Sequence, residues 1–287
     1  MKYLKKFELL DEMQEHKISF YDETRQIFNS SYPLHLFSSK DFKYIDFDDI
    51  TIFYGGNGSG KTTLINMISE KLKSSRKSSL NKGSYFDIYV HNCKYDMSFN
   101  QPMEIKTITS DDVFDYLLDV RSINANVNRE KESLSKTYLN YKFSNDKNSF
   151  DNYDELKNNY DSKRKTMSKF VRERLVNNNI IECSNGESAL MFWEREIKDD
   201  SIYILDEPEN SLSAENQLKL KKFIEDSARF YNCQFIISTH SPFLLKIIGA
   251  KIYDLDEVPV KTKKWNELPN VLAYYNFFKE YEHEFNT

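Results

Sequence analysis

One nine-residue segment contains the residue types that bind a phosphate group. Of the seven glycines in the chain, four lie between positions 55 and 60. The segment reads Gly55-Gly56-Asn57-Gly58-Ser59-Gly60-Lys61-Thr62-Thr63 and matches the pattern G-x-x-x-x-G-K-[ST] in full. Glycines let the backbone turn tightly enough to direct its N–H groups at phosphate oxygens, and a helix start adds positive potential. We therefore expect the whole segment to bind a nucleotide, with Lys61 at the β- and γ-phosphates and Thr62 on Mg²⁺.

Two adjacent carboxylates follow a second apolar segment. Residues 201–205 predict a buried strand, and Asp206 and Glu207 come directly after it. A carboxylate at the carboxyl end of a strand beside the glycine loop can hold Mg²⁺, which is the role we expect for Asp206. The next acid, Glu207, can polarise a water that attacks the γ-phosphate. Two acids at a strand end are also common as solvated groups, so the surrounding segments decide their meaning.

A third apolar segment, residues 234–238, leads into Thr239 and His240. A histidine at this strand end can donate a hydrogen bond to the γ-phosphate and hold the water and Glu207 in register. A nucleotide kinase, which also uses a glycine loop of this kind, seldom carries two successive acids and needs no such histidine. The sequence therefore favours an NTP hydrolase over a kinase.

The segment Cys183-Ser184-Asn185-Gly186-Glu187-Ser188 precedes an apolar helix start. A serine and a glycine at a helix N-terminus can form a second anion-binding corner, although an ordinary helix cap would look the same. Its position, 22 residues before Asp206, supports the functional interpretation. We assign Ser184, Gly186 and Glu187 to nucleotide binding.

The four segments together resemble a known family. The sequences GGNGSGKTT, SNGES, YILDEPENSLS and FIISTHSP resemble the Walker A, signature, Walker B with D-loop, and switch-histidine segments of the ABC ATPases. The chain looks most similar to small stand-alone bacterial ABC-type proteins labelled AAA-family ATPases, relatives of the ATPase heads of SMC and RecF proteins. The resemblance covers residues 50–245. It differs from transporters in the signature, which reads CSNGE rather than LSGGQ, in Ser213 of the D-loop, and in an acid near Asp112 where a Q-loop glutamine is expected.

The resemblance implies an α/β P-loop fold of the ABC type, with a mostly parallel sheet, an N-terminal antiparallel β subdomain and a helical insertion. It implies ATP and Mg²⁺ as cofactors, and ATP hydrolysis with Glu207, His240 and Lys61 as the catalytic residues. It also implies a homodimer on ATP binding, because the signature serves the nucleotide of the partner copy. A protein effector encoded nearby, and a bacterial antiviral defence or DNA-repair context, are further expectations of this resemblance.

The rest of the chain predicts how these segments are organised. We expect one ATPase domain over residues 1–287, with a helical arm at 112–180 between the Q-loop region and the signature. Segments 3–10, 17–21 and 42–47 predict the strands of the antiparallel sheet. Apolar residues at helical spacing predict a helix near 152–176, and the run 144–152 predicts a turn.

Composition limits the function classes. The net charge is −5, from 40 basic and 45 acidic residues, so the whole protein is not a polycation suited to nucleic acid. No apolar run approaches the ~20 residues of a membrane span, and the charged N-terminus is unlike a signal peptide, so a cytoplasmic location is expected. The three cysteines are far apart and support neither a disulfide framework nor a zinc site.

Two alternatives stay open at this stage. One is the ATPase subunit of a membrane ABC transporter, against which the altered signature and the basic arm count. The other is a DNA-bound repair or defence ATPase. The arm supports it with 13 Lys or Arg against 8 Asp or Glu in residues 120–180. Within the arm we expect Lys165, Lys169 and Arg172 to share one helix face as a basic strip.

Overall fold

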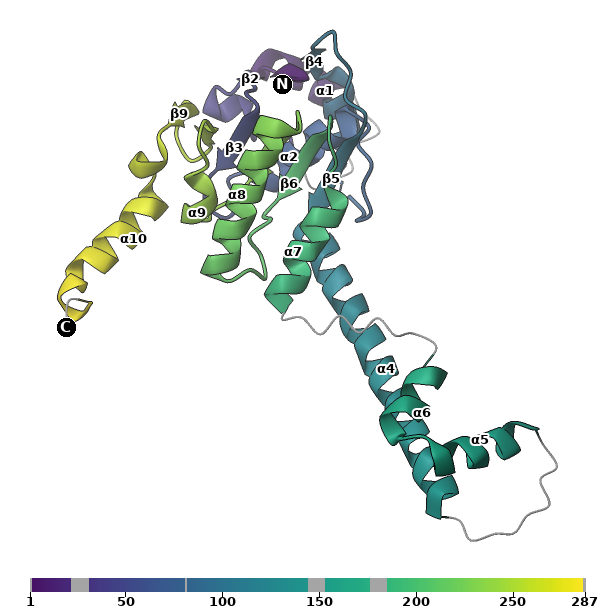
Figure 1. Ribbon diagram of the computed structural model, residues 1–287. Coiled ribbons are helices and arrows are strands. Elements are labelled where there is room, and N and C mark those ends of the chain that lie inside the picture. The colour runs from purple at the N-terminus through teal and green to yellow at the C-terminus, as the bar shows by residue number, and fades with distance from the viewer. Residues whose placement is uncertain (1, 22–30, 81, 144–152, 176–184, 286–287) are drawn as a thin grey trace. The chain divides into compact units, whose positions relative to one another are not determined.

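The computed structural model describes residues 2–21, 31–80, 82–143, 153–175 and 185–285 (Figure 1). It divides into two compact units. The first combines Met1–Phe114 with Ala189–Thr287, and the second is Asp115–Ser188. None of the described helices is both long enough and apolar enough to cross a membrane.

A six-stranded sheet forms the centre of the first unit. Its order is β5-β6-β7-β3-β8-β9, and only the β8–β9 pair is antiparallel. The strands are β3 (Ile50–Tyr54), β5 (Ile105–Thr109), β6 (Ile202–Asp206), β7 (Gln234–Ser238), β8 (Lys251–Asp254) and β9 (Lys261–Lys263). Every residue of β3, β6 and β7 is buried, as expected for parallel strands covered on both faces. The predicted α/β fold with a mostly parallel sheet is confirmed.

A separate antiparallel sheet has the order β2-β1-β4. Its strands are β1 (Leu4–Glu8), β2 (Tyr44–Asp46) and β4 (Lys94–Met97). The predicted strand at 17–21 is wrong, because these residues end helix α1 (Glu12–Tyr21). The Asp11 carboxylate accepts from the Gln14 N–H at 2.8 Å and the Gln14 side chain accepts from the Asp11 N–H at 3.0 Å, a reciprocal cap that starts the helix.

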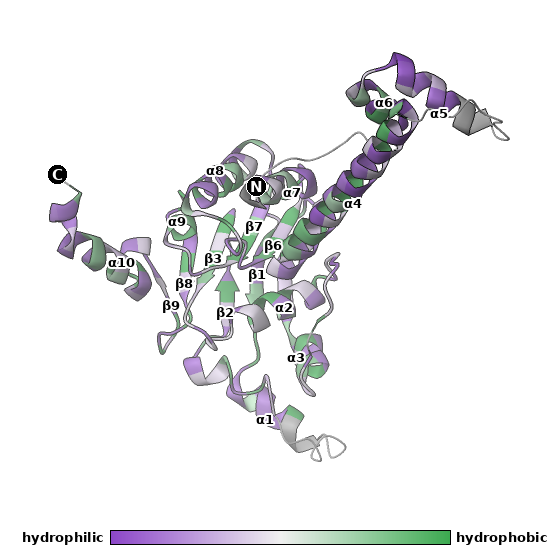
Figure 2. Cartoon of the chain, turned by 90° about the horizontal axis from the view of Figure 1, so that it is seen from below, coloured by the Kyte–Doolittle hydropathy of each residue, from purple (hydrophilic) through white to green (hydrophobic). Residues whose placement is uncertain are grey.

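Further helices of the first unit lie beside the sheets or, in the case of α10, extend away from them (Figure 1). They are α2 (Lys61–Lys71), α3 (Phe86–Asn92), α8 (Ala214–Phe230), α9 (Pro242–Leu245) and α10 (Pro269–Glu280), with single turns η2 (Ser38–Lys40), η3 (Trp265–Glu267) and η4 (Glu282–Glu284). Helix α2 packs on β6 and β7, and α8 packs on β7 and α9. Figure 2 shows α2 and α8 on opposite sides of the sheet.

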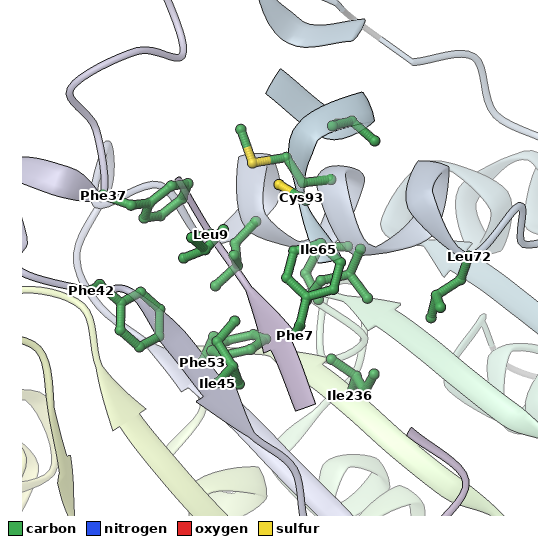
Figure 3. Close-up of a cluster of buried hydrophobic side chains, with 14 of the residues drawn as sticks. Phe7, Leu9, Phe37, Phe42, Ile45, Phe53, Ile65, Leu72, Cys93 and Ile236 are labelled. Atoms are coloured by element: carbon green, nitrogen blue, oxygen red, sulfur yellow. The ribbon is translucent and has the colours of Figure 1, made fainter. Parts of the chain in front are cut away.

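The largest apolar core lies where α2 meets both sheets (Figure 3). Phe7 of β1, Ile45 of β2, Phe53 of β3 and Ile65 of α2 are fully buried there. The β-sheet at the N-terminus therefore anchors the helix that follows the glycine loop. Burial of four such side chains contributes roughly 1.5–3 kcal/mol each.

The second unit contains most of α4 (Ser110–Phe143), together with α5 (Tyr153–Arg164) and α6 (Met167–Arg174); α7 (Asn185–Glu196) crosses the boundary between the units. The single helix predicted near 152–176 is wrong, since α5 and α6 are separate. Thr166 caps α6 by accepting from the Lys169 N–H at 3.4 Å, which ends α5 before it. Tyr138, Phe170 and Val171 form a small buried cluster with Leu134 and Leu175.

The prediction that Lys165, Lys169 and Arg172 share one helix face is wrong for Lys165. Lys165 lies between α5 and α6, and its ammonium pairs with Asp161 at 3.0 Å and with Glu173 at 2.7 Å. Lys169 and Arg172 are exposed on α6. The predicted turn at 144–152 lies outside the described residues, and the division into one domain with an arm at 112–180 stays a prediction.

Candidate nucleotide-binding site

Strand register brings the predicted residues to one edge of the central sheet. Asp206 pairs across β6–β7 with Ser238, and Ser238 pairs across β7–β3 with Phe53, two residues before the glycine loop. On the other side Asp206 pairs with Thr109, the last residue of β5. Since β3, β5, β6 and β7 run parallel, their carboxyl ends all open on this edge, where ligands bind in open α/β sheets.

The glycine loop has the conformation that its glycines allow. Gly58 and Gly60 have φ values of 81° and 103°, in the left-handed region that favours glycine. A Cβ at Gly55 would lie 2.5 Å from Ser59 Oγ, so only glycine fits where the loop closes on itself. Gly56, Asn57 and Gly58 are exposed at its tip.

Lys61 begins α2, and its ammonium lies under the loop. Its Nζ donates to the carbonyls of Gly55 at 2.8 Å and Gly56 at 3.0 Å. The side chain is buried, and this burial lowers the pKa of Lys61, while the nearby carboxylates of Glu207 and Asp206 oppose the shift. A buried ammonium held by two neutral carbonyls gains from an anion beside it.

Thr62, Asp206 and Ser238 form a hydroxyl–carboxylate cluster beside Lys61. Thr62 Oγ1 donates to Asp206 Oδ1 at 3.3 Å, and Ser238 Oγ donates to the same carboxylate oxygen. Burial raises the pKa of Asp206, although both hydroxyl hydrogen bonds favour its ionised form. Hard oxygen donors of this kind are the ligands that Mg²⁺ prefers.

Glu207 and His240 form a direct pair. Glu207 Oε1 lies 2.8 Å from His240 Nε2, and Glu207 Oε2 accepts from the Asn210 side chain at 3.2 Å. Burial alone would raise the pKa of Glu207, but the hydrogen bonds from His240 and Asn210 outweigh it and hold the pKa below its usual range. At neutral pH Glu207 is therefore a carboxylate, the form that a general base needs.

The backbone at Glu207 is held in an uncommon conformation. Its φ is 49°, in the left-handed region, and its N–H donates to Ser238 at the carbonyl, 3.0 Å, and at Oγ, 3.2 Å. These bonds to the neighbouring strand fix the turn that directs the Glu207 side chain away from β6. Ser238 thus supports both acids, a role that the sequence reasoning missed and that the parallel register of β6 and β7 indicates.

Glu209 holds the backbone around His240. Its Oε1 accepts from Thr239 Oγ1 at 2.6 Å, from the His240 N–H at 2.9 Å and from the Ser241 N–H at 3.2 Å. Burial raises the pKa of Glu209, while these donors oppose that effect. Asn270, in the first turn of α10, donates from Nδ2 to the His240 carbonyl at 2.8 Å.

Two further charged residues, also missed from the sequence, support the glycine loop. Lys40 donates to the carbonyls of Ser59 at 2.9 Å and Leu255 at 2.7 Å. The carboxylate of Asp256 accepts from the Gly56 N–H at 2.7 Å. Both come from segments distant in sequence, and no local motif marks them.

The described residues fit ATP with Mg²⁺. Ser59 Oγ is buried with no hydrogen-bond partner in the described protein, and it lies within the glycine loop. The buried ammonium of Lys61 donates hydrogen bonds to two neutral carbonyls of the loop, and Thr62 with Asp206 offers a hydroxyl and a carboxylate 3.3 Å apart. Phosphate oxygens would satisfy the first two groups and a divalent cation the third.

The predicted signature residues belong to another part of the chain. Gly186 and Glu187 lie in the first turn of α7 and belong to the second unit, while Ser184 lies outside the described residues. Their role in nucleotide binding therefore stays a prediction.

Comparison with known proteins gives two family matches. The family model described as ABC transporter matches residues 44–210, and the model described as AAA ATPase domain matches residues 181–245. No curated protein matches the chain in sequence.

Comparison with solved structures gives matches that include the following three. The SMC head domain from Thermotoga maritima has 17% identity and a TM-score of 0.38, covering 88% of this chain and 94% of its own. A nucleotide-free ATP-binding cassette from an ABC transporter has 14% identity and a TM-score of 0.39, covering 96% and 99%. A putative metal-chelate type ABC transporter in an inward-facing conformation has 18% identity and a TM-score of 0.38, covering 82% of each chain.

The ABC transporter model extends from β2, before the glycine loop, through Asp206 and Glu207 at the end of β6. This match covers more than half of the sequence, and the chain therefore belongs to the ABC transporter family of P-loop ATPase domains.

Proposed function

We propose that the protein hydrolyses ATP with Mg²⁺ and couples hydrolysis to the opening of an ATP-bound homodimer. Glu207 accepts a proton from the water whose oxygen attacks the γ-phosphorus, as the bond to the β–γ bridging oxygen breaks and ADP leaves. His240 positions Glu207 and this water. The 2.8 Å contact between Glu207 Oε1 and His240 Nε2 is the observation that carries this proposal.

Binding and positioning of ATP fall to the glycine loop. The N–H groups of residues 55–63 and the Lys61 ammonium hold the phosphates, and Ser59 Oγ gains a partner there. Thr62 and Asp206 would hold Mg²⁺, which neutralises charge on the phosphates when bound. Most of the catalytic effect then comes from positioning and electrostatic stabilisation.

The dimer completes the site. The signature residues Ser184, Gly186 and Glu187 of one copy bind the ATP held by the glycine loop of the partner copy. ATP binding closes the dimer, hydrolysis opens it, and the helical arm passes this change to an effector protein. We place this switch in the cytoplasm, in a bacterial antiviral defence or DNA-repair context.

Replacing Glu207 with Gln tests the chemistry. The variant should bind ATP as the wild type does, because the side chain keeps its shape, while turnover falls by about 10²- to 10⁴-fold, the range of general-base losses. Fluorescent-nucleotide binding and steady-state phosphate release measure the two effects. Glu215→Gln, at an exposed acid in the first turn of α8, is the matched control. Near-normal hydrolysis by Glu207→Gln would overturn the assignment.

The Glu207→Gln protein also tests the dimer. ATP should increase its association, seen as faster sedimentation than in the same sample without ATP, and Ser184→Arg should abolish this increase by placing bulk and charge at the composite interface. If Ser184→Arg still dimerises in response to ATP, the signature does not face the nucleotide of the partner.

One alternative, the ATPase subunit of a membrane transporter, is suggested by the name of the family model that matches. It predicts that the protein copurifies with an integral membrane partner. Active protein recovered from a detergent-free lysate with no such partner excludes it.

A further inference from the structure

Helix α10 carries a large apolar surface that the first unit does not cover. From Leu272 to Phe285 every residue is exposed. Seven of these residues are apolar or aromatic and between 38% and 72% exposed, and we call them the α10 surface. They are Leu272, Tyr274, Tyr275, Phe277, Phe278, Tyr281 and Phe285.

The α10 surface is distributed around most of the helix. At 100° per residue, Leu272, Tyr275 and Phe278 point in different directions from Phe277, so no single wall could cover them all. Asn276 and Glu280 occupy the remaining side of the helix. So wide an apolar surface is normally buried. Figure 2 shows green residues alternating with purple ones along α10.

The first unit offers a groove beside this helix. The groove has a volume of about 1100 Å³ and lies between α10 and the helices α8 and α9. Ala214, Leu218 and Phe243 form its apolar wall on α8 and α9, and Tyr275 and Phe278 face it from α10. A helix and an apolar groove are thus presented together by one chain.

Charge around the groove complements the end of the helix. The exposed Lys246 lines the groove, and Lys221 lines it in a pair with Glu225 at 3.1 Å, whereas the exposed Glu280, Glu282 and Glu284 lie at the end of α10 and in η4. The acidic end of one α10 fits against Lys246 at the rim of another groove. Such reciprocal complementarity within a single chain is the property of an isologous interface.

The area agrees with a stable dimer. Taking about 200 Å² for each aromatic side chain and the observed exposures, the α10 surface presents on the order of 650 Å², near the ~800 Å² per partner of a standard interface. The groove wall adds further apolar area.

We propose that a second copy of this chain covers the α10 surface, with α10 of each copy lying in the groove of the other. This interface forms without nucleotide, so it is distinct from the proposed ATP-bound dimer and does not depend on ATP hydrolysis.

Sedimentation of nucleotide-free protein over a range of micromolar concentrations tests the interface. The wild type should be a dimer, and Tyr275→Glu with Phe278→Glu should associate at least about tenfold more weakly, because two charges would enter an apolar contact. Phe99→Glu, at a fully exposed aromatic residue far from α10 in sequence, should leave the dimer intact. A wild type that stays monomeric, or an α10 variant that dimerises as tightly as wild type, overturns the proposal.

Cysteine cross-linking tests which chain supplies the helix. Leu218→Cys and Phe278→Cys proteins are mixed at low concentration so that subunits exchange, then concentrated and treated with a bismaleimide. A covalent dimer should form in the mixture and not with either protein alone; treated wild type controls for the native cysteines, of which Cys93 and Cys233 are buried. A mixture that gives no covalent dimer above the level of treated wild type overturns the proposal.

Discussion

The nucleotide edge of the first unit and the helical second unit hold their charged residues in different ways. At the nucleotide edge, Lys61 binds backbone carbonyls, and Glu207 is fixed through Ser238 and His240, all within the motifs that follow buried strands. In the second unit, Asp161 is held by side-chain pairs with Lys165 and Arg174. The charged residues at the nucleotide edge lie in motifs that follow buried strands and can be read from the sequence. The pairs of Asp161 depend on how α5 and α6 meet, which no local pattern predicts.

The two regions also differ in what keeps them folded. The core of the first unit joins two sheets and α2, while the second unit contains a cluster built on Tyr138, Phe170 and Val171. Short helices such as α5 and α6 are marginal without packing. We therefore expect the second unit to open more readily than the nucleotide edge.

The largest effect is expected from Phe170→Ala, which should increase the difference in stability between the second unit and the nucleotide edge. Phe170 is fully buried, packs edge-on against Tyr138 at 5.4 Å between ring centroids and lies under the Arg174 guanidinium. Its removal should cost the second unit about 3–5 kcal/mol. Hydrogen exchange should then show lost protection in α5 and α6 and unchanged protection in β3 and β7.

Tyr160→Ala is the control, because Tyr160 is largely exposed in α5 and contacts only the Arg164 guanidinium among the described interactions. It should cost no more than about 1 kcal/mol. Equal loss of protection in β3 and β7 with Phe170→Ala would show that the two units unfold together.

The next largest effect is expected from Lys61→Ala, which tests whether the Lys61 ammonium, held by backbone carbonyls, binds the phosphates of ATP. Removal of a charged donor to phosphate should weaken ATP binding by about 1.5–3 kcal/mol, or roughly 10- to 150-fold. Titration with a fluorescent ATP analogue measures it, with the exposed Lys222→Ala as control. Wild-type affinity in Lys61→Ala would contradict the assigned contact.

A smaller effect concerns pH and Glu207. Because its folded pKa is lowered, the carboxylate persists as pH falls, and hydrolysis should be lost only on the acid side of the usual glutamate range. Asn210→Ala removes one of the hydrogen bonds that favour the carboxylate, so the acidic limb should move to higher pH. Initial rates between roughly pH 4 and 8 show this limb. A limb that stays in place would mean that Asn210 does not act on Glu207.

The smallest effect concerns nucleic acid and the second unit. If DNA binds α6, replacing Lys169 and Arg172 with Ala should lower the salt slope by at most about two units. Adding Lys165→Ala should change nothing further, because its ammonium is already paired with Asp161 and Glu173. Binding measured at two salt concentrations with ATP present separates these cases. If Lys165→Ala lowers the salt slope by a further unit, the ion pairs of Lys165 are contradicted. If the wild type does not bind DNA, this role for α6 is excluded.

The sequence predicted the central sheet and the residues at its carboxyl edge because both depend on local patterns. An apolar segment followed by Gly55–Gly60, by Asp206 or by His240 can be recognised as a strand from the sequence. Parallel pairing of these strands then brings the residues at their carboxyl ends together.

Other features depend on contacts between distant segments. Lys40 and Asp256 support the glycine loop from segments with no motif of their own. Residues 17–21 predict a strand by their own pattern, but the reciprocal cap between Asp11 and Gln14 starts a helix that continues through them. The break before α6 was missed because Thr166 interrupts an apolar spacing that otherwise continues across it. Periodicity reports which face is buried, but it does not report where one helix stops and the next begins.

Asn270 has a consequence for how binding events add together. Its side chain holds the His240 carbonyl, and its N–H donates at 3.1 Å to the hydroxyl of Tyr54, the residue directly before Gly55. The first turn of α10 is thereby hydrogen-bonded to the residue before the glycine loop and to the residue that pairs with Glu207. If a protein binds α10 and displaces this turn so that Tyr54 or His240 moves, the affinity for ATP changes with it. Thermodynamic reciprocity then requires ATP to change the affinity for that protein by the same factor. The coupling between the two binding events can therefore be measured by titrating either ligand.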